Sequence, residues 1–245
     1  MGFKVVIPAR YESTRLPGKP LIKIGEIPMI IHVAKRASMS GAEEVLIATD
    51  DERVKKASES FGFEAVMTQK RHISGTDRIL EVANKKKWLD DQVIINVQGD
   101  EPLIDPRLIS MIATAMDEGG LDYVTACSKF QSIEEFVSPD NVKVVFDKDN
   151  FAIYFSRALI PFNTSDGDWN RDASYHHIGI YGYSLKLLQT FCSLPTNELE
   201  KTEKLEQLRA LKNRIPLKVI IYQGSFIKGV DTLEDLVAVK KIICN

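Results

Sequence analysis

The sequence predicts one α/β domain over residues 1–245, built on a mostly parallel, twisted sheet with flanking helices and a smaller mixed-sheet insertion. Three observations indicate this fold class. Short apolar runs alternate with segments of helical periodicity in the first half of the chain. These runs lack the alternating polar residues of a half-exposed strand, which is typical of strands buried on both faces. The composition, 44% hydrophobic and 27% charged residues, is that of a folded globular protein.

The elements of the first half follow one another in a strand–helix order. Strands are predicted at Lys4–Ile7 (KVVI), Val45–Ala48 (VLIA) and Val93–Val97 (VIINV). Helices are predicted at Met29–Ala37, Asp51–Phe61, Gly75–Lys86 and Pro106–Met116, the last with proline in its favoured first turn. This alternation favours a parallel sheet with helices on both faces.

The pattern changes after about residue 120, where few helices are predicted between the strands. Strands are expected at Val142–Phe146, Phe151–Phe155, Ile178–Tyr183 and Leu217–Ile221, and helices at Glu198–Lys212 and Thr232–Ile243. Phe162–Ala173 is the best loop candidate. We interpret residues 120–195 approximately as an insertion in the α/β core, not as an independent domain.

Charge and composition exclude several classes of function. The net charge is −2, which argues against a general nucleic-acid or acidic-membrane binder, although not against a local basic patch. No apolar run approaches the roughly 18 residues of a spanning helix, and the start of the chain does not resemble a signal peptide. Three widely spaced cysteines are expected to be reduced thiols of a cytoplasmic protein.

The loop after the first strand, PARYESTRLPGKP (8–20), is the first candidate for a binding site. It carries Arg10, Arg15 and Lys19, with little acid nearby beyond Glu12. Ligands of open α/β sheets bind outside the carboxyl ends of the strands, and clustered cations favour an anion such as phosphate. The loop matches neither GxxxxGK[ST] nor GxGxxG. The plainer interpretation is a solvated basic loop.

Two aspartates follow other candidate strands. Asp100, in the turn QGDEP, directly follows VIINV, and Asp231 precedes the last helix. Mg²⁺ is typically held by one or two carboxylates together with substrate phosphates, so the pair suits a divalent cation. Each also has a purely structural interpretation, because Asp100 can simply form a turn and Asp231 or Thr232 can cap the helix. Spacing alone does not show that the two aspartates meet.

Taken together, these segments resemble the 3-deoxy-manno-octulosonate (Kdo) cytidylyltransferases, or CMP-Kdo synthetases. The matching stretches, in family order over nearly the whole chain, are VIPARYESTRLPGKPL (6–21), H-x-SGTDR (72–78), NVQGDEP (96–102), NVKVVFD and YFSRALIP (141–161), HIGIYGY (177–183), LEQLR (205–209) and GVDTLEDL (229–236). The combination of SGTDR, VQGDEP, GIYGY and LEQLR is specific to that family.

The resemblance implies a GT-A-like nucleotidyltransferase fold and the reaction of CTP with Kdo to give CMP-Kdo and pyrophosphate. It also implies Mg²⁺ dependence, a cytoplasmic homodimer and a role in lipopolysaccharide biosynthesis, with the insertion serving sugar binding and dimerisation. No nucleic-acid or membrane partner is expected.

The resemblance and the residue chemistry together assign candidate roles. We expect Arg10 and Lys19, assisted by Arg15, to neutralise the triphosphate, and Asp100 and Asp231 to hold Mg²⁺. The resemblance alone implies which residues lie near the cytidine, namely Pro8, Ala9, Ser74, Gly75, Arg78 and Gln98, and which face the sugar, namely Arg157, His177, Tyr181, Glu206 and Gln207. Ser74–Thr76 also suits a helix N-terminus, Tyr181 a core aromatic, Glu206 a solvated surface and His177 a structural hydrogen-bonder.

Two positions depart from the family pattern, so the exact substrate stays open. His176 stands where arginine is expected before the GIYGY strand, and Ser184 stands where arginine is common after it. A Kdo variant, such as the 8-amino sugar, is therefore a candidate substrate, as is a sialic-acid-type sugar. Two rival functions are a sugar-1-phosphate nucleotidyltransferase and a non-catalytic nucleotide-binding subunit.

Overall fold

The fold is built around one twisted sheet, described by a computed structural model that covers residues 2–12, 16–72, 74–164, 169–224 and 229–244. The strand order is β11 (Lys218–Ile221), β7 (Tyr123–Lys129), β10 (Tyr175–Ser184), β6 (Val93–Asn96), β1 (Phe3–Ala9), β4 (Glu44–Thr49) and β5 (Ala65–Met67). Only β10 along this path runs antiparallel to its neighbours, β6 and β7. The predicted fold class, a mostly parallel sheet with flanking helices, is confirmed.

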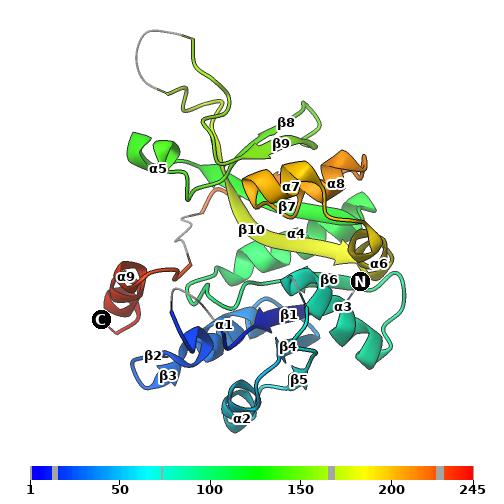
Figure 1. Ribbon diagram of the computed structural model, residues 1–245, viewed down its shortest axis with the longest axis vertical. Helices are drawn as coiled ribbons and strands as arrows, with labels where there is room; N and C mark the ends of the chain where they lie inside the picture. Colours follow the sequence, from blue (N-terminus) through cyan, green and yellow to red (C-terminus); the bar gives the residue numbers. More distant parts are fainter. Residues whose placement is uncertain (1, 13–15, 73, 165–168, 225–228, 245) are drawn as a thin grey trace.

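Helices cover both faces of the sheet because the buried strands are apolar on both sides (Figure 1). In β1, Val5 and Ile7 pack in one core with α1 (Met29–Ser38), α2 (Glu52–Ser60) and α4 (Pro106–Gly119). The intervening Val6 packs in a second core with α3 (Gly75–Lys86) and α6 (Leu185–Ser193). This alternation fixes the register of β1 and leaves its carboxyl end, where the basic loop begins, at one edge of both cores.

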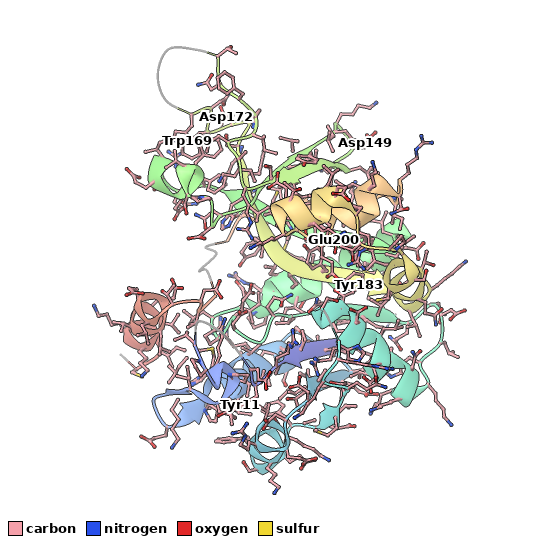
Figure 2. The ribbon with its side chains drawn as sticks, in the orientation of Figure 1. Tyr11, Asp149, Trp169, Asp172, Tyr183 and Glu200 are labelled. Carbon is pink, nitrogen blue, oxygen red and sulfur yellow. The ribbon has the colours of Figure 1, made fainter. Side chains whose placement is uncertain are left out.

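An arm extends the sheet beyond β10 (Figure 1). It contains α5 (Ile133–Val137), β8 (Lys143–Phe146) and β9 (Ala152–Ser156), and β8 pairs with both β10 and β9. Trp169 lies beside α5 and stacks on Phe136 at 5.3 Å between ring centroids (Figure 2). Strands β7 and β10 belong to the central sheet, so the part of 120–195 that projects from it is the segment between these two strands.

The predicted helix over Glu198–Lys212 is wrong as a single element. The structure has α7 (Glu198–Glu203) and α8 (Leu208–Lys212), separated at Lys204, whose backbone is left-handed with φ of 54°. A left-handed residue ends a helix by turning the chain. Leu205 then enters the core, and Glu206 and Gln207 lie in the connection between the two helices.

The last helix, α9 (Leu233–Ile243), lies beside the first loop of the chain (Figure 1). That loop contains a 3₁₀ turn, η1 (Lys19–Leu21), and the short pair β2 (Lys23–Ile24) and β3 (Ile27–Pro28). Leu236 and Val239 of α9 pack with Leu16, Ile24 and Met29. This small core brings residues 229–231 to the basic loop. Among the described residues, no helix combines the length and apolarity that a membrane span requires.

Candidate active site

A cavity of about 410 Å³ lies at the carboxyl end of β1 and is called here the phosphate-loop cavity. Six residues predicted to bind the nucleotide line it, namely Pro8, Ala9, Arg10, Lys19, Gly75 and Gln98. Both Asp100 and Asp231 line it as well. The site therefore forms where the first strand, the loop after β6 and the segment before α9 meet. Arg15 lies outside the described residues.

Lys19 joins the two predicted metal ligands. Its Nζ atom donates to Oδ2 of Asp100 at 2.6 Å and to Oδ1 of Asp231 at 3.0 Å. The Lys19 side chain is 13% exposed, whereas the two carboxylates are about one-third exposed. Two aspartates that are 131 positions apart in the sequence thus share one cationic centre, with room for a ligand beside them.

The backbone explains why the two aspartates meet. The N–H of Val230 donates to the carbonyl oxygen of Asp100 at 2.8 Å. A Cβ atom on Gly229 would lie 3.0 Å from that same oxygen, so glycine permits the close approach. Thr232 is the N-cap of α9 and accepts from the N–H of Asp235, so the capping role belongs to Thr232 and not to Asp231.

A second cavity, of about 450 Å³, adjoins the first and is called here the sugar-side cavity. The five residues predicted to face the sugar all line it, namely Arg157, His177, Tyr181, Glu206 and Gln207. Four residues line both cavities, namely Gly75, Gln98, Asp100 and Asp231. The carboxylate pair therefore stands at the boundary between a cation-lined cavity and a polar one.

His177 is buried and held by Thr125, whose Oγ1 lies 2.9 Å from Nε2 of the ring. The same hydroxyl donates to the carbonyl oxygen of Ile180 at 2.8 Å. A hydroxyl has one hydrogen, so Nε2 must carry a proton and donate to Thr125. Burial, with a smaller contribution from the nearby His176, lowers the pKa of His177 to about 3. The ring is therefore neutral, with its lone pair on Nδ1, and it serves as a hydrogen-bond acceptor.

Glu206 lies in the connection between α7 and α8 and is not the solvated surface residue of the plainer interpretation. Its Oε2 accepts a hydrogen bond from Oγ1 of Thr76 at 2.6 Å, and its Oε1 lies 3.5 Å from the guanidinium of Arg209. Burial raises the pKa of Glu206. The buried amide nitrogen of the adjacent Gln207 has no hydrogen-bond partner within the described part of the chain, so it retains a donor for a ligand.

Arg157 lies at the end of β9, where the backbone of the neighbouring segments holds its guanidinium. Nε donates to the carbonyl oxygen of Glu203 at 2.9 Å, and Nη1 donates to that of Pro139 at 3.0 Å. Guanidinium has five N–H groups. Those not used in these two bonds give the sugar-side cavity donors for an anion.

Two residues predicted near the cytidine line neither cavity. Ser74 is the N-cap of α3, where it forms a capping box with Asp77. Arg78 is completely buried and donates to Asp50 at 2.9 Å and to Thr68. The structure therefore places Ser74 at the N-terminus of α3, directly before Gly75, and Arg78 on the buried face of that helix.

Several cavity residues were missed by the sequence analysis. Glu101, Asp140, Asn141 and Lys204 line the sugar-side cavity. Burial and the adjacent charge of Asp100 raise the pKa of Glu101 to about 8. Its position in the QGDEP turn was the signal available. Of the two departures from the family pattern, His176 lines the cavity, whereas Ser184 caps α6 through a bond from the N–H of Leu187.

The donor set at the boundary fits a divalent cation that also binds substrate. Asp100 and Asp231 supply oxygen ligands from two different loops, and Lys19 already places a positive charge between them. Over the described ranges, no group of three or more His, Cys, Asp or Glu side chains is arranged to hold a metal. Two carboxylates suit Mg²⁺, which keeps several waters and takes further ligands from phosphates.

The chain is similar to known proteins over most of its length. The family model described as cytidylyltransferase matches residues 4–220. A 3-deoxy-manno-octulosonate cytidylyltransferase from Thioalkalivibrio sulfidiphilus is 43% identical, with 99% of each chain covered. An 8-amino-3,8-dideoxy-manno-octulosonate cytidylyltransferase from Shewanella pealeana is 46% identical, with 96% of each chain covered.

Two solved structures of cytidylyltransferases are similar to this one. A CMP:2-keto-3-deoxy-manno-octonic acid synthetase in complex with CTP superposes with a TM-score of 0.91 at 40% identity, covering 100% of this chain and 99% of that one. A cytidylyltransferase from Leptospira borgpetersenii, 19% identical with a TM-score of 0.63, shares the fold. The chain belongs to the cytidylyltransferase family of nucleotidyltransferases, and its full length resembles the members that act on eight-carbon acidic sugars.

Proposed function

We propose that the protein transfers the CMP group of CTP to the anomeric hydroxyl of Kdo, giving CMP-Kdo and pyrophosphate. One observation carries this proposal: the carboxylates of Asp100 and Asp231 stand where the phosphate-loop cavity and the sugar-side cavity meet. A transfer between a nucleotide and a sugar requires the two reacting groups to meet at one charged point. The names of the full-length relatives and the CTP bound in the similar structure support the identity of both substrates.

The phosphate-loop cavity suits the triphosphate. Attack on the α-phosphorus of a highly charged anion requires charge neutralisation and alignment more than covalent chemistry. Arg10 and Lys19 supply positive charge on one wall, and Arg15 is proposed to assist from the same loop. Lys19 has to release at least one carboxylate when a divalent cation binds, and its ammonium is then available to a phosphate oxygen.

Asp100 and Asp231 are the proposed ligands of Mg²⁺. When bound, the ion neutralises phosphate charge and lowers the pKa of the sugar hydroxyl, so no histidine base is required. The chain's own contribution is to hold the two carboxylates together through Gly229, Val230 and the backbone of Asp100. Non-catalytic nucleotide binding does not explain a second carboxylate at the boundary with the sugar-side cavity.

Selection of the base is assigned to the residues around the end of β1. The backbone of Pro8 and Ala9, together with Gly75 and Gln98, lines the phosphate-loop cavity. Ser74 and Arg78 are proposed to act from behind these residues, by fixing the start of α3 and its buried face. Cytosine is distinguished from uracil when its amino group meets acceptors that uracil leaves unpaired.

The sugar-side cavity suits an acidic sugar with many hydroxyls. Arg157 is proposed to pair the sugar carboxylate, because its guanidinium lines the cavity and retains unused donors. Neutral His177 accepts a hydrogen bond from a hydroxyl, and Gln207 donates one. Tyr181 and Glu206 complete the wall, with Glu206 oriented by Thr76.

The 8-amino variant of Kdo is the second candidate substrate. The observation that favours it is the full-length relative of that name, which is as similar to this chain as the Kdo enzymes are. His176, one of the two departures from the family pattern, lines the sugar-side cavity. The two sugars differ only at one terminal carbon, so the same site chemistry serves both.

We also propose that the protein is a homodimer that works in the cytoplasm, where CTP is made, and contributes to lipopolysaccharide biosynthesis. Exposed apolar side chains on the arm support a partner there: Ile153 is 61% exposed and Phe162 is 81% exposed. A second copy that covers these residues would remove them from water. Light scattering after size exclusion tests the dimer, because the chain has a mass of 27.6 kDa and a monomer or a dimer is readily distinguished.

The test of the proposed function is pyrophosphate release. Purified protein is supplied with CTP and Mg²⁺, together with Kdo, 8-amino-Kdo or sialic acid in separate reactions. The proposal expects release that depends on sugar and metal, with Kdo giving the highest kcat/KM. A higher kcat/KM for 8-amino-Kdo establishes the second candidate, and no release with any sugar favours a non-catalytic nucleotide-binding protein.

A further inference from the structure

We propose that Lys143 is a positioning residue that joins three segments of the sugar-side wall and thereby sets the affinity for the acidic sugar. This inference rests on the proposed function, because it names a determinant of sugar binding. Lys143 belongs to β8 and does not line either cavity. It acts through hydrogen bonds to the backbone of segments that form the sugar-side cavity.

The ammonium of Lys143 is enclosed by main-chain carbonyls. The residue is completely buried, and its Nζ donates to the carbonyl oxygens of Ser138 at 2.7 Å, Asn141 at 2.8 Å and Arg157 at 3.1 Å. No carboxylate of the described residues forms an ion pair with it. A buried cation with three carbonyl acceptors and no carboxylate in direct contact is costly to maintain, which points to a role for its three bonds.

Each acceptor belongs to a segment that forms the sugar-side cavity. Ser138 and Asn141 bracket Asp140, and both Asp140 and Asn141 line the cavity. Arg157, which directly follows β9, also lines it. Lys143 therefore connects the loop that follows α5 to the end of β9, next to Arg157, the residue proposed to bind the sugar carboxylate.

Arg157 completes the same network from the other side. Its Nη1 donates to Pro139, within the loop that Lys143 holds, and its Nε donates to the carbonyl oxygen of Glu203. The Glu203 carboxylate accepts from the N–H of Arg157 at 2.9 Å and from Oγ of Ser156 at 2.6 Å. Glu203 ends α7, directly before the cavity residues Lys204–Gln207. Arg157 thus links three segments of the cavity wall: the loop after α5, the end of β9 and the end of α7.

The chemistry of the group explains why lysine stands here. A charged ammonium has three N–H donors, which matches the three carbonyl acceptors, whereas a neutral amine has two. Burial is the largest influence and lowers the pKa of Lys143 to about 8. The charged groups that face Lys143 are Arg157, which disfavours its cationic form, and Glu203, which favours it; Phe136 adds a ring 5.9 Å away. One donor is therefore lost as pH rises through the pKa.

The first test separates sugar affinity from general damage. Lys143→Met removes all three donors at similar length, and Val54→Ala on α2 is the matched control, because Val54 is buried in the other core. We expect the KM for Kdo to rise roughly tenfold or more in Lys143→Met, as expected when buried acceptors lose their donors. The KM for CTP should stay within about twofold of the wild type in both variants.

The outcomes are distinguishable from failure of the proposed function. Absence of wild-type pyrophosphate release defeats the proposed function, whatever the variants do. Wild-type release with an unchanged KM for Kdo in Lys143→Met overturns the positioning role of Lys143. Equal rises in KM for Kdo and for CTP also overturn it, because they indicate general damage.

A second measurement does not depend on activity. Amide hydrogen exchange of residues 138–141 should accelerate in Lys143→Met, since Asn141 donates its N–H to Ser138 within the loop that Lys143 holds. Exchange in β1 should not change, and in Val54→Ala the loop should keep its wild-type exchange. Unchanged exchange of residues 138–141 in Lys143→Met overturns the proposal.

The pH profile of the wild type covers the case in which Lys143→Met fails to fold. We expect the KM for Kdo to rise above about pH 8, and this rise to disappear in Lys143→Arg, whose guanidinium stays charged. A rise that persists in Lys143→Arg belongs to another group and overturns the assignment to Lys143.

Discussion

Lys19 Nζ lies 2.6 Å from Oδ2 of Asp100, at the boundary between the two cavities of the protein. The same ammonium is 3.0 Å from Asp231. This contact answers the question that spacing in the sequence left open, because it shows that the two aspartates surround one centre of positive charge. The proposed reaction places a divalent cation and the α-phosphate at that centre.

Replacement of either aspartate should abolish most turnover and leave the fold intact. In Asp100→Asn or Asp231→Asn, we expect kcat to fall by at least about a hundredfold, because a charged ligand at the reacting centre is lost. The ion pairs with Lys19 are partly exposed, so the free energy of unfolding should change by only about 1 kcal/mol. Pyrophosphate release and thermal unfolding check these two outcomes, with exposed Asp91→Asn as control. A fully active Asp100→Asn enzyme would remove Asp100 from the mechanism.

A methyl group at Gly229 should weaken the metal site without removing any functional group. Its Cβ would lie 3.0 Å from the carbonyl oxygen of Asp100, so the segment that carries Asp231 has to shift. We expect Gly229→Ala to need a several-fold higher Mg²⁺ concentration for half-maximal rate. Val237→Ala, at an exposed position of α9 that lines neither cavity, is the control for the Mg²⁺ requirement. An unchanged Mg²⁺ requirement in Gly229→Ala contradicts the role given to this close approach.

CTP should be used at least about ten- to a hundredfold better than UTP. The proposed base-reading groups lie at the end of β1 and at Gln98, and uracil leaves at least one buried polar group unpaired, at a cost of about 1–3 kcal/mol. The ratio of kcat/KM for the two nucleotides, measured with the same sugar, checks this. Equal use of CTP and UTP shows that these groups do not read the base.

His177 should stay neutral, with its proton on Nε2, from pH 5 to pH 8. Nitrogen-15 spectra of the four histidines, assigned with a His177→Gln variant, report this tautomer directly. Thr125→Ser should preserve the tautomer because it keeps the hydroxyl, whereas Thr125→Val should mix the two tautomers. A wild-type ring that carries its proton on Nδ1 refutes the hydrogen-bond count.

The same histidine should make stability depend on pH in the acid range. Its folded pKa of about 3 lies below the ordinary value of 6.5, so the unfolded chain takes up a proton first as pH falls. The contribution of the neutral ring to the free energy of unfolding is complete above about pH 6.5 and is lost as pH falls toward 3. The loss at pH 5 amounts to about 2 kcal/mol. Denaturant unfolding at pH 7 and pH 5 measures it. A loss of the same size in His177→Gln assigns the effect to other groups.

Local patterns were sufficient to predict most of the sheet and its helices. The helix at Gly75–Lys86 has the bounds that were predicted, because a capping serine and a regular apolar face are both local signals. The break at Lys204 was missed, since a left-handed lysine has no sequence signature. Strand β7 was missed although it is central in the sheet, because its sequence YVTACSK mixes polar and small residues that only its neighbours bury.

Candidate residues near a strand end were easier to predict than those held by distant partners. Arg10, Lys19 and Asp100 follow buried strands, and strand ends of a parallel sheet share one edge. The burial of Arg78 depends on Asp50, which is 28 positions away, and no local pattern shows that pairing. Lys143 is similar, because a lysine within a short apolar strand does not reveal that three carbonyls surround it.

The most direct test of the central claim is a crystal structure of the protein with CTP, Mg²⁺ and the sugar bound. The account predicts a metal ion with carboxylate oxygens of both Asp100 and Asp231 at about 2.0–2.1 Å, an oxygen of the α-phosphate in the same coordination sphere, and the sugar in the cavity lined by Arg157. A metal bound elsewhere, or CTP bound with its phosphates away from the two aspartates, would contradict it.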